Sequence, residues 1–220
     1  GGFLGPDSTS DQRNAFALRA VGEHLVPEHR PDVLTLWLTE PDHAQHGYGL
    51  GSPQALAALA ALDRQLEQLT EALAQDGEEH TYILLSDHGF TTISERVNVD
   101  ERLIAAGLKA SPDDKSIVCN CNSFYLAESA LDRLDELVRF LAGEPWIGAL
   151  FLRDDLMEAC PGAMPQSTVF GKHSRSAELM FGYRWWPQDN EYGIHGCSAS
   201  YSSIAASHGS ASPHEVNNSL

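Results

Sequence analysis

The 220-residue sequence has few positive charges, few cysteines and no long apolar run. Lys and Arg together number 14 against 31 Asp and Glu, which gives a formal net charge of −17. A field of this sign repels a polyanionic backbone, and this argues against a nucleic-acid-binding scaffold. Because no stretch of about eighteen apolar residues is present, no segment of this chain is expected to span a membrane. Apolar residues still make up 42% of the sequence, which is enough to build a hydrophobic core.

The four cysteines are too few for a disulfide scaffold at this length. Cys119 and Cys121 lie in an apolar alternating run, where side chains two residues apart share one face of a strand. We expect two small buried thiols there, since a zinc knuckle usually uses a C-x₂-C pair. Cysteine usage leaves the cellular compartment open.

Both ends of the sequence look like cuts within a longer polypeptide. Residues 1–6 contain neither an initiator Met nor the charged and apolar regions of a signal peptide. Residues 216–220 read as the beginning of a further element. We therefore expect an internal fragment.

The first half of the sequence alternates helical and strand patterns. Helical spacing of apolar residues predicts a helix within residues 8–28, and Ser52-Pro53 predicts the start of a long helix that ends at Gly77. Residues 32–38 are a continuous β-prone run and residues 82–85 a wholly apolar one, as expected of strands covered on both faces. A strand, a helix and a second strand in this order indicate a right-handed crossover in a parallel sheet.

The second half has a different pattern. Residues 117–126 and 147–152 read as strands, residues 129–141 as a helix, residues 168–170 with 178–185 as a hairpin, and residues 190–212 as a loop. The predicted fold class is α/β, with an α/β/α sandwich around a mainly parallel sheet and a small α+β cap, and the domain is expected to be incomplete. The predicted division is a core part at residues 1–110, a cap or insert at 111–187 and a return to the core at 188–220.

Three Asp/His clusters stand out. Asp42 and His46 follow the first predicted strand in a short loop, and Asp87 and His88 directly follow the second. Since ligands of parallel sheets bind beyond the carboxyl ends of the strands, both clusters are expected at one edge of the sheet. The third cluster is a late His-Gly pair, at either His195 or His208.

These residue types indicate a site for two transition-metal ions. Imidazole and carboxylate suit Zn²⁺ or Mn²⁺, and two such ions about 4 Å apart stabilise both oxygens of a phosphoryl displacement. Taken singly, Asp42 and His46 are equally compatible with an ordinary polar loop. Asp87 and His88 are harder to explain as structure alone, because they place charge beside a buried strand. A small phosphate-bearing substrate is compatible with the acidic chain, since bound dications reverse the local potential.

Pro41-Asp42-His43-x-x-His46, Ser86-Asp87-His88-Gly89 and the late His208-Gly209 together resemble the type I phosphodiesterase/nucleotide pyrophosphatase branch of the alkaline phosphatase superfamily. The resemblance implies that Asp42 and His46 bind one zinc together with the late His, and that Asp87 and His88 bind a second. We take the late His to be His208, because the segment after it is similar to the family segment that leads into the last core helix. His195 remains the alternative.

The resemblance also implies features that this sequence lacks. In the family, an earlier strand carries a further metal-binding Asp and is followed by a Thr or Ser nucleophile, which forms a covalent phospho-enzyme. The residues before the Pro-Asp-His motif do not match that region, and the hydroxyls of residues 8–10 are interpreted as helix caps. We therefore assign no catalytic nucleophile and expect the fragment itself to be inactive.

The family implies a phosphodiester or nucleotide pyrophosphate substrate for the parent protein. Sister branches are alternatives, namely phosphonoacetate hydrolase, sulfatase or a phosphomutase. A non-catalytic metal-binding domain of the same fold is an alternative of another class. The sequence does not decide between diester, monoester and phosphonate substrates, nor does it indicate an oligomeric state.

Overall fold

The computed structural model describes residues 4–160 and 162–217 of the chain. The α-helices are α1 (Ser10–Ala20), α2 (Val26–His29), α3 (Asp42–Tyr48), α4 (Pro53–Leu73), α5 (Val99–Ala105), α6 (Leu134–Gly143) and α7 (Pro213–Val216). The strands are β1 (Thr91–Arg96), β2 (Ile117–Asn120), β3 (Ser123–Leu126), β4 (Ile147–Leu152), β5 (Met164–Pro165), β6 (Leu179–Tyr183), β7 (Trp185–Asp189), β8 (His195–Ser200) and β9 (Ala206–Ser207). The fold class is mixed α/β, as the sequence predicts.

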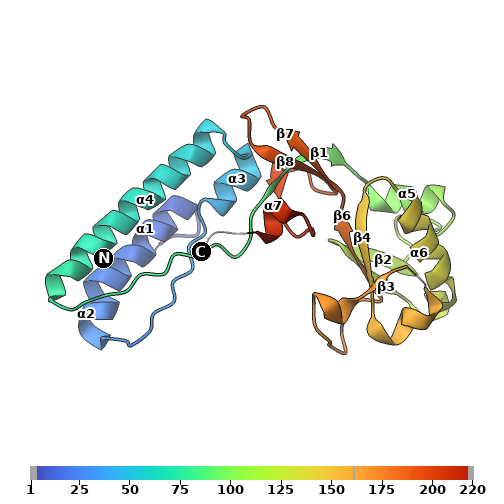
Figure 1. Ribbon diagram of the computed structural model, residues 1–220, viewed down its shortest axis with the longest axis horizontal. Helices are drawn as coiled ribbons and strands as arrows, with labels where there is room; N and C mark the ends of the chain where they lie inside the picture. The colour runs from blue at the N-terminus through green and yellow to red at the C-terminus, as the bar shows by residue number, and fades with distance from the viewer. Residues whose placement is uncertain (1–3, 161, 218–220) are drawn as a thin grey trace.

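The two long N-terminal helices, α1 and α4, lie side by side at one end of the molecule (Figure 1). α1 begins with a capping box between Thr9 and Gln12, and it continues through a π-helical turn at Val21–Leu25 into α2. α4 begins at Ser52, whose hydroxyl accepts a hydrogen bond from the N–H of Ala55. The helix predicted within residues 8–28 and the helix start predicted at Ser52-Pro53 are therefore confirmed. A 3₁₀ turn at Ala74–Asp76 follows α4 and ends at Gly77 in the left-handed conformation.

Two sheets make up the rest of the fold. The first has the strand order β7-β8-β1-β9, in which β1 and β8 pair in parallel and the outer pairs are antiparallel. The second has the order β2-β3-β6-β4-β5 and is largely antiparallel. α5 and α6 lie with the second sheet, at the opposite end of the molecule from α1 and α4 (Figure 1).

The larger hydrophobic core belongs to this second sheet. Trp146, Phe124 and Phe181 are fully buried there, and leucines of α6 pack against the same cluster. A smaller cluster of Val21, Val26 and Leu73 joins the N-terminal helices. The residues predicted to form a cap thus carry most of the core of the described chain.

The predicted strands at residues 32–38 and 82–85 are not formed. Both segments are extended, run from the far end of the helices toward the first sheet, and belong to neither sheet (Figure 1). Most of their apolar side chains are exposed, with Val33 at 83% and Ile83 at 74% of full exposure, whereas Leu36 packs partly buried against the smaller core cluster of the N-terminal helices. A central strand needs hydrogen-bonding partners and covering layers, and the described residues provide neither for these segments.

Two further predictions from the second half are wrong. Residues 168–170 do not form a hairpin with 178–185, because β6 pairs with β3 and β4 instead. The supposed loop at 190–212 contains β8, which pairs with β1 and β7 inside the first sheet. β8 is rich in small residues, so its sequence lacks the apolar alternation by which strands are recognised. No helix of the described residues is long and apolar enough to cross a membrane.

Candidate metal centre

Asp42 and His46 lie on α3 and not in a loop. Asp42 is in the first turn and His46 is one turn later, so that their side chains share one helix face. The Nε2 atom of His46 is 3.5 Å from Oδ1 of Asp42. The buried Glu40 accepts a hydrogen bond of 3.0 Å from the N–H of Ala44, which stabilises the N-terminus of this short helix.

Asp87 and His88 lie on the segment that leads into β1. The Nε2 atom of His88 is 3.3 Å from Oδ2 of Asp87 and 3.8 Å from Oδ1 of Asp42. Gly89, the next residue, is required here for space. A Cβ atom at this position would lie 2.1 Å from the carbonyl oxygen of His214, so only glycine allows α7 to approach so closely.

The late histidine at the cluster is His208. Its Nε2 atom is 3.7 Å from Oδ1 of Asp42, and its ring stacks on that of His88 with centroids 3.5 Å apart. His195 lies at the start of β8, is exposed, and pairs with Asp189 at 2.7 Å. The structure thus brings together the five predicted metal ligands, Asp42, His46, Asp87, His88 and His208.

The orientation of the imidazoles suits a cation. Nδ1 of His46 is 2.8 Å from the carbonyl oxygen of Ala206, and Nδ1 of His88 is 3.0 Å from that of Gly89. A carbonyl oxygen only accepts hydrogen bonds, so each Nδ1 carries a proton, and in the neutral ring each Nε2 presents a lone pair. These are the tautomers in which histidines bind metals through Nε2.

One carboxylate oxygen of Asp42 also suits a bound cation. Its Oδ1 atom is buried and has no hydrogen-bond partner among the described residues. The Nε2 atoms of His46, His88 and His208 all lie 3.5–3.8 Å from it. A buried carboxylate oxygen without a donor is costly, and a bound cation would remove that cost.

The tightest group of candidate ligands is Asp42, His88 and His208, whose ligand atoms all lie within 4.8 Å of one another. This group takes residues from both of the predicted ligand sets, in which His88 belongs with Asp87 and not with Asp42. The division of the five residues between two ions stays a prediction.

Burial lowers the pKa of His208 below its ordinary value, and the neighbouring His88 and His46 lower it further. The ring of His208 therefore stays neutral to a lower pH than an exposed histidine. Since only neutral imidazole binds a metal, this shift favours ligation.

Phe90 is a residue of the cluster that the sequence analysis missed. Its ring packs edge-on against the rings of His46, His88 and His208, with centroids 5.0–5.3 Å apart. This contact limits the rotation of all three imidazoles. The sequence offered one indication of this role. Phe90 directly follows Asp87-His88-Gly89 and directly precedes β1, so its side chain was bound to lie near the cluster.

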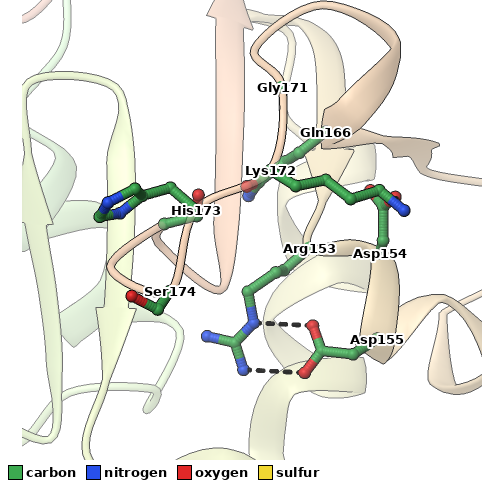
Figure 2. A pocket seen from close by; sticks show the side chains of 9 residues that line it. Arg153, Asp154, Asp155, Gln166, Gly171, Lys172, His173 and Ser174 are labelled. Carbon is green, nitrogen blue, oxygen red and sulfur yellow. Dashed lines mark hydrogen bonds and ion pairs between the residues drawn. The ribbon is translucent and has the colours of Figure 1, made fainter.

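A polar pocket of about 760 Å³ lies elsewhere, between residues 153–155, which follow β4, and the loop at residues 171–176 (Figure 2). Its cations are already paired, with Arg153 bound to Asp155 and Glu178, and Lys172 to Asp154. None of the five clustered residues lines it, and we assign it no role.

Comparison with known proteins agrees with the geometry. The family model for type I phosphodiesterase/nucleotide pyrophosphatase matches residues 7–180, which is most of the chain. The chain belongs to this family. The match ends before His208, so the assignment of His208 to the candidate site is based on the geometry of the cluster.

Relatives of known function align over shorter stretches. Venom phosphodiesterase 2 of Crotalus adamanteus is 45% identical over 72 residues, which is 32% of this chain and 9% of that protein. Human ectonucleotide pyrophosphatase/phosphodiesterase family member 7 is 36% identical over 67 residues, which is 30% of this chain and 15% of that protein.

The same fold occurs in murine ectonucleotide pyrophosphatase/phosphodiesterase 5. The two structures superpose with a TM-score of 0.62 at 16% identity, over 98% of this chain and 52% of that chain. An inactive variant of the murine protein in complex with AMP gives the same TM-score at 17% identity. The chain thus spans about half the length of its structural relative.

Proposed function

We propose that the whole protein hydrolyses phosphodiester or pyrophosphate bonds in small nucleotide-type substrates, using two bound Zn²⁺ ions, with Mn²⁺ as the alternative metal. The observation that carries this proposal is the buried Oδ1 atom of Asp42, which has no hydrogen-bond donor within residues 4–160 and 162–217 and is surrounded by three imidazole Nε2 atoms. A carboxylate and several neutral imidazoles are the ligands that Zn²⁺ prefers in hydrolytic sites.

Asp42, His46 and His208 would hold one ion, and Asp87 and His88 would take part in holding the other. When bound, such ions withdraw charge from phosphoryl oxygens and lower the pKa of water. The contribution of this chain is to fix the proton of each neutral ring on Nδ1, through the carbonyls of Ala206 and Gly89, and so to direct the Nε2 lone pairs of His46 and His88 into the cluster.

In this proposal the nucleophilic hydroxyl comes from residues outside the 220. Thr9 is the N-cap of α1, where its hydroxyl accepts a hydrogen bond from the N–H of Gln12. Nearer hydroxyls have partners of their own, as Ser86 donates to the carbonyl of His88 and Ser210 to Glu215. A hydroxyl that forms a covalent phospho-enzyme needs a positioned, activated oxygen, which none of these provides.

The substrate class rests on relatives. The venom relatives are named phosphodiesterases, and the murine structural relative is known as an inactive variant in complex with AMP. A nucleoside monophosphate is the product expected when a nucleotide diester or pyrophosphate is cleaved. We therefore place the proposed substrate among small nucleotide derivatives.

The test is an assay of the whole protein on bis-p-nitrophenyl phosphate and on p-nitrophenyl phosphate, with zinc or with chelator. We expect diester hydrolysis that chelator abolishes and zinc restores. His46→Ala should abolish it, whereas His195→Ala, at an exposed histidine outside the cluster, should leave it unchanged. Preference for the monoester would indicate a sister branch, and zinc binding without hydrolysis would indicate a non-catalytic domain.

A further inference from the structure

Glu215 is a buried carboxylate next to the proposed metal centre and is not one of its ligands. It belongs to α7 and is only 3% exposed. A buried charge is costly unless it is fully hydrogen-bonded, so its partners identify what it stabilises.

The carboxylate of Glu215 is bound to the loop that carries His208. Its Oε2 atom accepts a hydrogen bond of 2.6 Å from the N–H of Ser210, and its Oε1 atom accepts one of 2.7 Å from the Ser210 hydroxyl. Ser210 is two residues beyond His208. Two bonds to one residue fix the path of the backbone that leads from the histidine.

The same carboxylate reaches the first sheet. Oε1 also accepts a hydrogen bond of 2.7 Å from the hydroxyl of Thr91, at the start of β1. Since the proton of Thr91 is used in this way, the Ser198 hydroxyl donates to Thr91 across 2.7 Å. The loop of His208 is therefore anchored to two neighbouring strands through Glu215.

The backbone of Glu215 is bound to the other histidine segment. Its carbonyl oxygen accepts a hydrogen bond of 2.7 Å from the N–H of Gly89, directly after His88. One residue thus contacts both segments whose imidazoles stack at 3.5 Å. The loss of either connection would let His88 and His208 move apart.

We propose that Glu215 is a positioning residue for the metal centre, which holds His208 in register with His88 so that both Nε2 atoms face Asp42. This inference rests on the proposed function, because it assumes that the cluster binds a metal. Residues that orient metal ligands typically change affinity by about 10–100-fold when they are removed.

Direct zinc binding by the intact chain tests the inference, with affinity measured by competition with a chromophoric chelator. Glu215→Ala leaves the donors of Ser210 and Thr91 without their acceptor, and we expect zinc affinity to fall by about 10–100-fold. Glu215→Gln should restore part of the affinity. Its amide oxygen can still accept from the N–H of Ser210, while the two hydroxyls rotate to accept from its amide nitrogen.

The matched control is Glu178→Ala, at a largely buried carboxylate of the second sheet. Glu178 accepts hydrogen bonds from Arg153 and from the N–H of Leu126, so this change also lowers stability. It should leave zinc affinity and the visible spectrum of bound Co²⁺ unchanged. Glu215→Ala should alter that spectrum, which depends on the number and geometry of the ligands.

The outcomes separate the two proposals. If the wild-type chain binds no zinc, the proposed function fails and this inference fails with it. If the wild type binds zinc and folded Glu215→Ala binds it equally well, only this inference is overturned. Equal losses in Glu215→Ala and Glu178→Ala would also overturn it, because general destabilisation would then explain both.

Should Glu215→Ala not fold, Ser210→Ala is the second test. It removes a single side-chain hydrogen bond to Glu215 and is expected to weaken zinc binding several-fold. Unchanged affinity in that variant would count against the inference.

Discussion

The ring of His88 stacks on the ring of His208, with centroids 3.5 Å apart and planes inclined by 18°. Burial lowers the pKa of His208, and the neighbouring His88 lowers it further, because two protonated imidazoles at this separation would repel each other. Each ring also has its Nε2 atom within 3.8 Å of Oδ1 of Asp42. The stacked pair is therefore arranged for a shared cation.

Loss of a single cluster residue should be costly to the whole protein. We expect His46→Ala or Asp87→Ala to lower the rate of diester hydrolysis by at least about a hundredfold, the scale of losing a metal ligand. Metal content per chain, measured on the same samples, should fall in parallel. Full activity in either variant would remove that residue from the site.

Zinc binding should weaken as the pH falls through roughly 6, because imidazole must be neutral to ligate. The pKa of His208 lies below its ordinary value, so protonation of this ring weakens zinc binding only at a lower pH than protonation of an exposed histidine would. Competition titrations between about pH 5 and pH 8 would measure the slope. Affinity that did not change across this range would argue against imidazole ligands.

The same shift has a consequence for the metal-free fold. Because the pKa of His208 is lower in the folded chain than in the unfolded chain, the unfolded chain binds the proton more readily. Stability should therefore decrease as the pH falls through about 6.5, the ordinary histidine pKa. His208→Gln should flatten this part of a urea-denaturation profile against pH. An equally steep profile in that variant would assign the dependence to other groups.

Gly89→Ala should damage both fold and site. The new Cβ atom would meet the carbonyl oxygen of His214 at 2.1 Å, so α7 must move. We expect a loss of about 1–3 kcal/mol in the free energy of unfolding, together with weaker zinc binding. The control is Gly143→Ala at the end of α6, where no atom lies within 4 Å of the new Cβ and the effect should be small. Urea denaturation and zinc titration of both variants would measure the difference.

The sequence predicted which polar residues lie together better than it predicted the strands around them. Asp42, His46, Asp87, His88 and His208 were named from residue types and order, and the structure brings them together. The preference for His208 over His195 agrees with the geometry. Such motifs can be recognised from sequence because each one brings its side chains together within a few residues, so that its recognition does not depend on contacts with distant segments.

The strands were harder because they depend on partners. Residues 32–38 and 82–85 are apolar enough for buried strands, yet a strand forms only where another backbone completes its hydrogen bonds. β8 is the opposite case, a strand that forms although its sequence does not predict one. Its small residues are buried by neighbouring segments, and the local sequence pattern does not reveal those neighbours. Phe90 and Glu215 were missed for the same reason, since both act through contacts with distant segments.

The last prediction is that the 220-residue chain binds zinc but does not turn over a diester, whereas the whole protein does. Bound metal can activate water unaided, so a trace of hydrolysis is compatible with it. Covalent catalysis needs a positioned hydroxyl, and the hydroxyls beside the cluster, at Ser86 and Ser210, are engaged with protein acceptors. The exposed apolar segments at residues 32–38 and 82–85 should also make the isolated chain poorly soluble. The decisive measurement compares the two proteins on bis-p-nitrophenyl phosphate with saturating zinc. Equal rates would place the nucleophile within these residues and would overturn the assignment made from the cluster.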